Sequence, residues 1–153
     1  MEHEPSDAEK AERLRDVLVN STFAKSLALS LAEQHFVPAT ELVGPGWEYT
    51  FKGQNERGFI LKYSPVSGNK DYIIIRIADI RQHRSFFLED WMKVHAIHNQ
   101  PDHFKLNAYP GSFLEQTSAF VQYLDRLLCH PDIMAILTSN EWEDIPFDWG
   151  GLK

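Results

Sequence analysis

Residues 47–79 read WEYTFKGQNERGFILKYSPVSGNKDYIIIRIAD, and this stretch decides the fold. Apolar residues occupy alternate positions in 47–52, 59–63 and 71–79, which is the period of half-buried strands. Each of the two breaks between these segments contains a glycine, and short loops of this kind join antiparallel neighbours. We therefore predict a three-stranded β-meander over 47–79, whose apolar face needs a covering layer of helices.

Two helices are predicted before the meander. Ser6 and Glu9 have the spacing of a capping box, in which each side chain bonds a free backbone amide of the first helical turn. A second helix, with Phe23 and Leu31 on one side, is expected to end at Pro38 because proline cannot continue a helix. These two helices supply part of the predicted covering layer.

Helical and strand patterns also follow the meander. Residues 85–98 fit a helix, although apolar residues crowd both of its sides and leave a strand as an alternative. Residues 103–109 alternate and predict a fourth strand, Ser112 begins the clearest helix of the chain, and Pro131 starts a short one. The fold class is therefore α+β, a single domain over 1–153 with a mostly antiparallel sheet of about four strands covered by N-terminal and C-terminal helices.

Composition excludes several classes of protein. The net charge of −7 opposes general binding to nucleic acid, since phosphate backbones attract cations. Apolar runs are too short for a membrane span and no secretory signal is recognisable. The single cysteine, Cys129, cannot form an internal disulfide, so we expect a cytoplasmic protein. No nucleophile elbow or phosphate-binding loop is present, and enzymatic activity is not expected.

Three histidines form the densest group of possible metal ligands. His95, His98 and His103 lie within nine positions, with Asp102 beside the last. Neutral imidazoles on neighbouring turns bind zinc and leave a position for water, which would suit a metal-assisted hydrolase. The spacing matches no established metal motif, and histidines near a helix C-terminus also interact favourably with the helix dipole. The main prediction is therefore no cofactor, with zinc as the alternative.

Arginines gather around the end of the meander. Arg76, Arg81 and Arg84, together with His83, are the main concentration of positive charge. Arginine offers a planar fork of donors to phosphate or carboxylate, whereas the structural alternative is pairing with nearby acidic side chains. If a pocket lies between the sheet and the helices, it would be lined by Tyr49, Tyr63 and Trp91 near Arg76, as in a small-ligand sensor.

The C-terminal residues 140–153 are unusually rich in aromatic and acidic side chains. Aromatic anchors with an acidic rim suit docking onto an apolar, basic-edged surface of another protein. The alternative is that this segment folds back and buries its rings on its own domain. The predicted contacts are the following residues: Trp142, Glu143, Asp144, Phe147 and Trp149.

Taken as a whole, the sequence predicts an acidic protein-binding module of the chaperone, immunity or adaptor type. Its partner is expected to be another protein with a basic surface, and neither nucleic acid nor a membrane. The oligomeric state is left open. The metal-assisted hydrolase and the small-ligand sensor are the two alternative functions.

Overall fold

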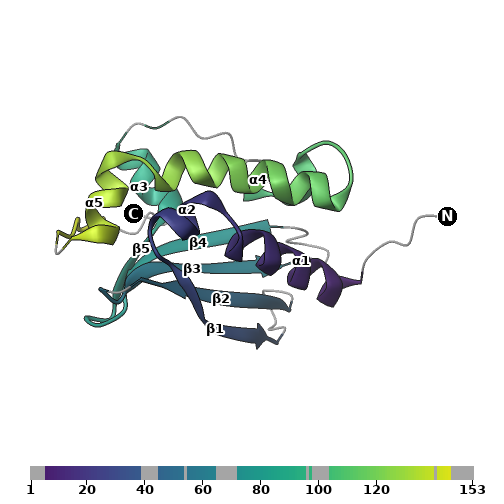
Figure 1. Ribbon diagram of the computed structural model, residues 1–153, viewed down its shortest axis with the longest axis horizontal. Helices are drawn as coiled ribbons and strands as arrows, with labels where there is room; N and C mark the ends of the chain where they lie inside the picture. The colour runs from purple at the N-terminus through teal and green to yellow at the C-terminus, as the bar shows by residue number, and fades with distance from the viewer. Residues whose placement is uncertain are drawn as a thin grey trace, which may run out of the picture.

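A computed structural model of the protein describes residues 6–38, 45–53, 55–64, 72–95, 97, 104–139 and 141–145. Five strands form one sheet, and the helices lie mainly on one of its faces (Figure 1). The elements are α1 (Asp7–Val19), α2 (Thr22–Ser26), β1 (Ser30–Val37), β2 (Gly46–Lys52), β3 (Arg57–Ser64), β4 (Tyr72–Asp79), β5 (Arg84–Phe87), α3 (Leu88–Val94), the 3₁₀ helix η2 (Leu106–Ala108), α4 (Phe113–Leu128) and α5 (Pro131–Thr138). The α+β class is confirmed.

The sheet is antiparallel throughout, with the strands in chain order from β1 to β5. Strands β2, β3 and β4 are the predicted meander, and two further strands flank it, so the sheet has five strands rather than about four. Tyr49, Leu61 and Ile75 are neighbours across β2, β3 and β4 on the helix-covered face. All three side chains are buried, and each such burial contributes about 1.5–3 kcal/mol.

The alternation within β4 separates the two faces of the sheet. Ile73, Ile75 and Ile77 are at most 3% exposed, whereas Ile74 is 37% exposed on the other face. Successive side chains of a strand point to opposite faces. The alternation of residues seen in the sequence therefore matches the alternation of buried and exposed side chains in β4.

The predicted second helix is wrong over most of its length. Helix α2 ends at Ser26, and Ala28 has φ 53°, a left-handed conformation that no helix continues through. The chain then turns and pairs with β2, which places Leu31 in β1 instead of on a helix. Most of β1 is exposed on both faces, so its sequence carries no alternation that would have revealed a strand.

The predicted strand over 103–109 is also wrong. Lys105 forms one isolated bridge with Tyr72, and the chain then enters η2. Phe104 and Leu106 are buried, but they reach the core from a 3₁₀ turn beside α4. For 85–98 the sequence left a helix and a strand open, and each is partly correct. Strand β5 ends at Phe87, and helix α3 follows it directly.

Two capping boxes begin the main helices of the covering layer. Ser6 and Glu9 cap α1, and Ser112 and Glu115 cap α4, with both reciprocal bonds formed in each case. Helix α4 contributes seven buried residues, the largest of which are Tyr123 and Phe120. Among the described residues, no helix has the length and hydrophobicity required to cross a membrane.

Candidate functional site

The start of the C-terminal segment lies against its own domain. The ring of Trp142 packs on Phe86, with 5.3 Å between the ring centroids. The Arg84 guanidinium stacks over the same indole at 4.6 Å, and that of Arg57 lies at 5.5 Å. Cation–π contacts of this kind contribute about 0.5–2 kcal/mol. Trp142 therefore contacts β5 and β3 and does not project as a free anchor.

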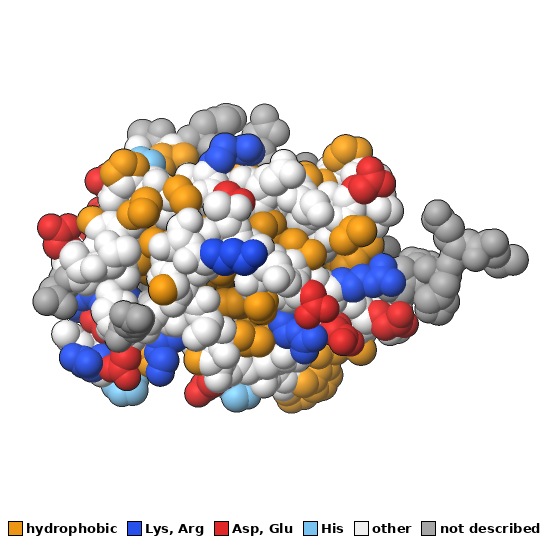
Figure 2. Space-filling model, viewed as in Figure 1, with side chains coloured by type: hydrophobic (Ala, Val, Ile, Leu, Met, Phe, Trp, Pro, Cys, Tyr) orange, Lys and Arg blue, Asp and Glu red, His pale blue; other side chains and the backbone are white. Residues whose placement is uncertain are grey.

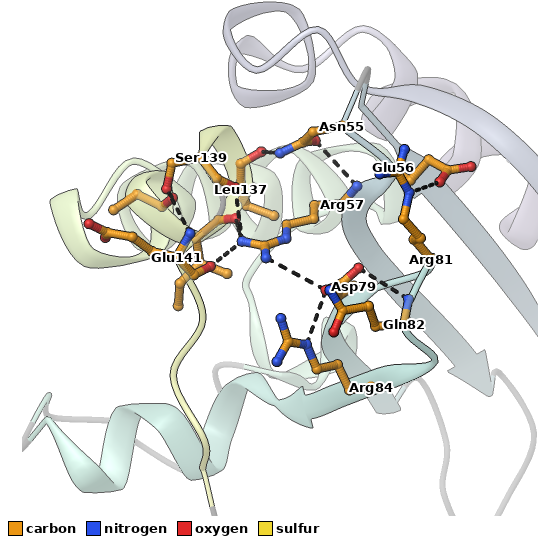
Figure 3. Close-up of polar contacts among 12 residues, drawn as sticks. Asn55, Glu56, Arg57, Asp79, Arg81, Gln82, Arg84, Leu137, Ser139 and Glu141 are labelled. Carbon is orange, nitrogen blue, oxygen red and sulfur yellow. Dashed lines mark hydrogen bonds and ion pairs between the residues drawn. The ribbon is translucent and has the colours of Figure 1, made fainter.

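Beside Trp142 lies a buried group of charges (Figure 3). Arg57 and Asp79 are cross-strand neighbours with side chains only 5% and 4% exposed, and Arg57 Nη2 lies 3.6 Å from Asp79 Oδ2. Arg84 Nε reaches the same oxygen at 3.0 Å. One carboxylate between two guanidinium groups avoids the large cost of a buried, unpaired charge.

Arg57 also binds the end of α5. Its Nη1 donates to the carbonyl oxygens of Ile136 at 2.8 Å and Ser139 at 2.9 Å, and to that of Glu141. The last carbonyls of a helix lack intrahelical partners, and here a buried guanidinium supplies the donors. Arg57 thereby fastens α5 and the following segment to the sheet.

The acidic side chains of this segment differ in their surroundings. Glu143 accepts from Trp91 Nε1 at 3.3 Å and lies 2.7 Å from His95 Nε2. Asp144 is exposed, and Phe147 and Trp149 lie outside the described residues. Of the five predicted partner contacts, two are therefore engaged within the domain in this structure.

The metal hypothesis rests on residues that are only partly described. His95 lies between two carboxylates, with its Nδ1 3.5 Å from Asp132 Oδ2 and its Nε2 beside Glu143. His98 and His103 are outside the described residues. Within the part of the chain that the structure describes, no three potential ligands are close enough to hold a metal ion.

The structure does not bring the four predicted pocket residues together. Tyr49, Tyr63 and Trp91 are fully buried core residues. The Tyr49 hydroxyl donates to the Ala11 carbonyl at 2.7 Å, and burial raises the pKa of this hydroxyl. Arg76 follows Ile75 in β4 and therefore lies on the opposite face of the sheet.

A cleft beside β4 holds a carboxyl group in an unusual environment. The cleft measures about 280 Å³, and its apolar side chains include Ile74 and Phe87. Burial raises the pKa of Glu89, although the Tyr72 hydroxyl, which donates to it at 3.2 Å, and the Lys93 charge act in the opposite direction. Burial likewise raises the pKa of Tyr72 to about 12.

The most accessible element is the edge strand β1. Six of its eight residues are exposed, and within the described ranges only β2 pairs with it. An edge strand presents a row of unpaired backbone donors and acceptors that is able to accept another strand. A register shift between Leu31 and Glu33 interrupts the ladder near its start, so 33–37 is the regular portion.

Two aromatic residues lie at the far end of this edge. Phe36 is 57% exposed, and its ring meets that of Trp47 edge-on at 5.2 Å. Figure 2 shows hydrophobic side chains at the lower rim of the molecule, where Figure 1 places the end of β1. Glu33 and His35 lie on the other side of the strand, 3.2 Å apart.

Sequence reasoning missed this edge because it assigned Leu31 to a helix. The only strand signal was the short β-favouring pair Phe36 and Val37 before Pro38. Comparison with known proteins gives no further guide: no family model, curated protein or solved structure matches this chain.

Proposed function

We propose that this protein is a non-catalytic protein-binding module whose β1 edge accepts an extended segment of a partner protein. The observation that carries the proposal is the eight-residue edge strand with six exposed residues and no described strand paired with its free side. Long, uncovered edges favour unwanted pairing, and most proteins protect them. An edge left accessible is the feature that strand-adding modules use.

The backbone and side chains of β1 have separate roles in the proposal. Main-chain hydrogen bonds along 33–37 supply affinity without sequence preference, and alternate side chains supply specificity. Exposed Phe36, backed by the half-buried ring of Trp47, offers an aromatic surface suited to an apolar residue of the added strand. On the other face, Glu33 favours a basic residue, and the net charge of −7 steers a basic segment toward the protein.

A second copy of the chain fits this edge less well than a foreign strand. Antiparallel self-pairing centred on Gln34 would place Glu33 opposite His35 of the other copy and Ala32 opposite Phe36. The irregularity between Leu31 and Glu33 would then disturb the new ladder twice, once on each side of the centre. A foreign strand that pairs along 33–37 meets no such interruption.

The contacts of the C-terminal segment also favour β1 as the binding site. Trp142 stacks on Arg84 and Phe86, and Glu143 bonds Trp91. These side chains would have to leave their own domain before they could bind a partner. Phe36 requires no such rearrangement, because more than half of its surface is already accessible.

A selection from a library of displayed peptides tests the proposal and reveals which sequences the edge prefers. Selected sequences should be extended, with an apolar residue three positions from a basic one, because Phe36 and Glu33 lie three positions apart on opposite faces of β1. Phe36→Asp should weaken binding of the best peptide about 30-fold, the effect of losing an aromatic contact of ~2 kcal/mol. Leu114→Asp is the matched control, because Leu114 is 56% exposed on α4 and should leave binding unchanged.

Two results would contradict this assignment. Equal binding by wild type and Phe36→Asp would remove β1 as the site. Sedimentation of the wild type as a dimer at micromolar concentration, with Phe36→Asp as a monomer, would show instead that the edge serves self-association.

A further inference from the structure

A hollow of about 260 Å³ lies on the face of the sheet opposite the helices, toward the β4–β5 turn. Ala78 and Ile60 form its floor. Arg76, Ile80, His83 and Ser85 stand around it. The small side chain of Ala78, 3% exposed and cross-strand from Ser85, leaves the space between these longer neighbours.

The charge around this hollow is positive although the chain as a whole carries −7. Arg76 is half-buried and forms no hydrogen bond or ion pair with any described residue. Arg84 and the buried Asp79 complete the lining. Asp79 pairs with both Arg84 and Arg57, so that carboxylate is already matched by two cations. Because no described carboxylate pairs with Arg76, its planar fork of donors can face a ligand.

The rim of the hollow is held in a fixed geometry. The Ile80 amide donates to the Glu56 carbonyl at 3.0 Å, which ties the β4–β5 turn to the β2–β3 turn. Arg81 Nε and Glu56 Oε2 form an ion pair across the same two turns at 2.9 Å. His83 has φ 53°, a conformation that is uncommon for a residue with a side chain. The backbone around the hollow is therefore already ordered before a ligand binds.

We propose that this hollow is a binding site for an oxyanion, a carboxylate or phosphate group carried by a small molecule or by an acidic side chain of a peptide. Arg76 supplies a two-pronged donor, and the Ser85 hydroxyl and His83 ring supply further polar contacts. Ile60 and Ile80 accommodate the apolar part next to the anionic group. The site lies away from the free edge of β1 and does not depend on the function proposed for that edge.

Amide chemical shifts of the full chain, titrated separately with inorganic phosphate, glutarate and an acetylated glutamate-containing tetrapeptide, test the proposal. Saturable shifts should centre on Arg76, Ile80 and Ser85. Arg76→Gln should weaken binding about tenfold, since it removes a charge-assisted contact. Ala78→Val should also weaken it by filling the floor while Arg76 remains. Lys62→Gln is the control, because Lys62 lies on the same sheet face outside the hollow.

The three probes separate the sources of the anionic group. Tighter binding of glutarate than of phosphate assigns the site to carboxylates, the reverse order assigns it to phosphate, and tightest binding of the tetrapeptide assigns it to an acidic side chain. Non-saturating shifts with all three probes would overturn the proposal. Equal losses in Lys62→Gln and Arg76→Gln would do the same, since they would indicate diffuse attraction to the face. Ser85→Ala provides a second local test if Ala78→Val does not fold.

Discussion

The two edges of the sheet differ in what covers them. At the β5 edge, a four-residue strand leads directly into α3, and the C-terminal segment packs beside it through Trp142. At the β1 edge, an eight-residue strand has six exposed residues, and the hydrogen bond from Arg15 of α1 to Gln34 is itself an exposed contact. Under the proposed function, the covered edge contributes stability and the bare edge is the one open to a partner strand.

The covered edge depends on interactions between residues that are distant in sequence. Arg57 joins the start of β3 to the end of α5, about eighty residues further along the chain. The bare edge depends on local features, because its exposed residues follow one another in β1. Substitutions at the two edges should therefore affect different measurements.

The largest effect is expected at Arg57. Arg57→Met removes the donors that bind the α5 carbonyls and weakens the compensation of the buried Asp79 charge, so the free energy of unfolding should fall by about 3–5 kcal/mol. Chemical denaturation measures this loss. Arg81→Ala is the control, since its exposed pair with Glu56 should contribute at most about 1 kcal/mol. Similar losses in the two variants would show that the buried network is not what holds this edge.

A smaller loss is expected when the C-terminal segment is shortened. Deleting 141–153 removes the packing of Trp142 on Phe86 and exposes apolar surface, which should cost about 2 kcal/mol and lower the melting temperature by several degrees. Calorimetric scans of the truncated and full-length proteins give the difference. An unchanged melting temperature would indicate instead that this segment binds a partner protein and does not stabilise its own domain.

Titration of Glu89 gives a weaker, pH-dependent effect near the covered edge. Burial raises the pKa of Glu89, so the folded state binds its proton more tightly than the unfolded state. Stability should therefore decline as pH rises from about 4.5, the ordinary value, through the raised one. Glu89→Gln keeps an acceptor for Tyr72 and removes the charge. Its melting temperature relative to wild type should rise between pH 4 and pH 7, and a constant difference would contradict this interpretation.

The smallest effect on stability is expected at the bare edge. Phe36→Asp should change the free energy of unfolding by less than about 0.5 kcal/mol, because the ring is mostly exposed already. Denaturation of Phe36→Asp and Leu114→Asp side by side checks this. A loss of several kcal/mol for Phe36→Asp alone would mean that the aromatic pair with Trp47 is structural.

The meander could be predicted from sequence because its strands each have one buried and one accessible face. Ile75 and Ile74 differ in exposure, and that difference appears in the sequence as alternation. Strand β1 could not be recognised in this way, since exposure on both faces removes the constraint that produces a pattern. Leu31 was consequently assigned to a helix.

The candidate sites were harder to predict than the fold. The acceptors of Arg57 are backbone carbonyls, which no residue type identifies. The sequence showed the group of arginines but not which of them has an acidic partner. Arg84 pairs with Asp79, whereas Arg76 lies on the opposite face of the sheet without a described partner. The difference between the two arginines depends on the strand register, which only the three-dimensional structure gives.

Hydrogen exchange of the protein with and without its best displayed peptide tests the central difference between the two edges most directly. Binding should slow exchange of the free edge amides within 33–37 at least about tenfold, because these donors enter a new ladder, and should leave 84–87 unchanged. Protection of 84–87 or 141–145, with exchange of β1 unaltered, would contradict the account and return partner binding to the covered edge.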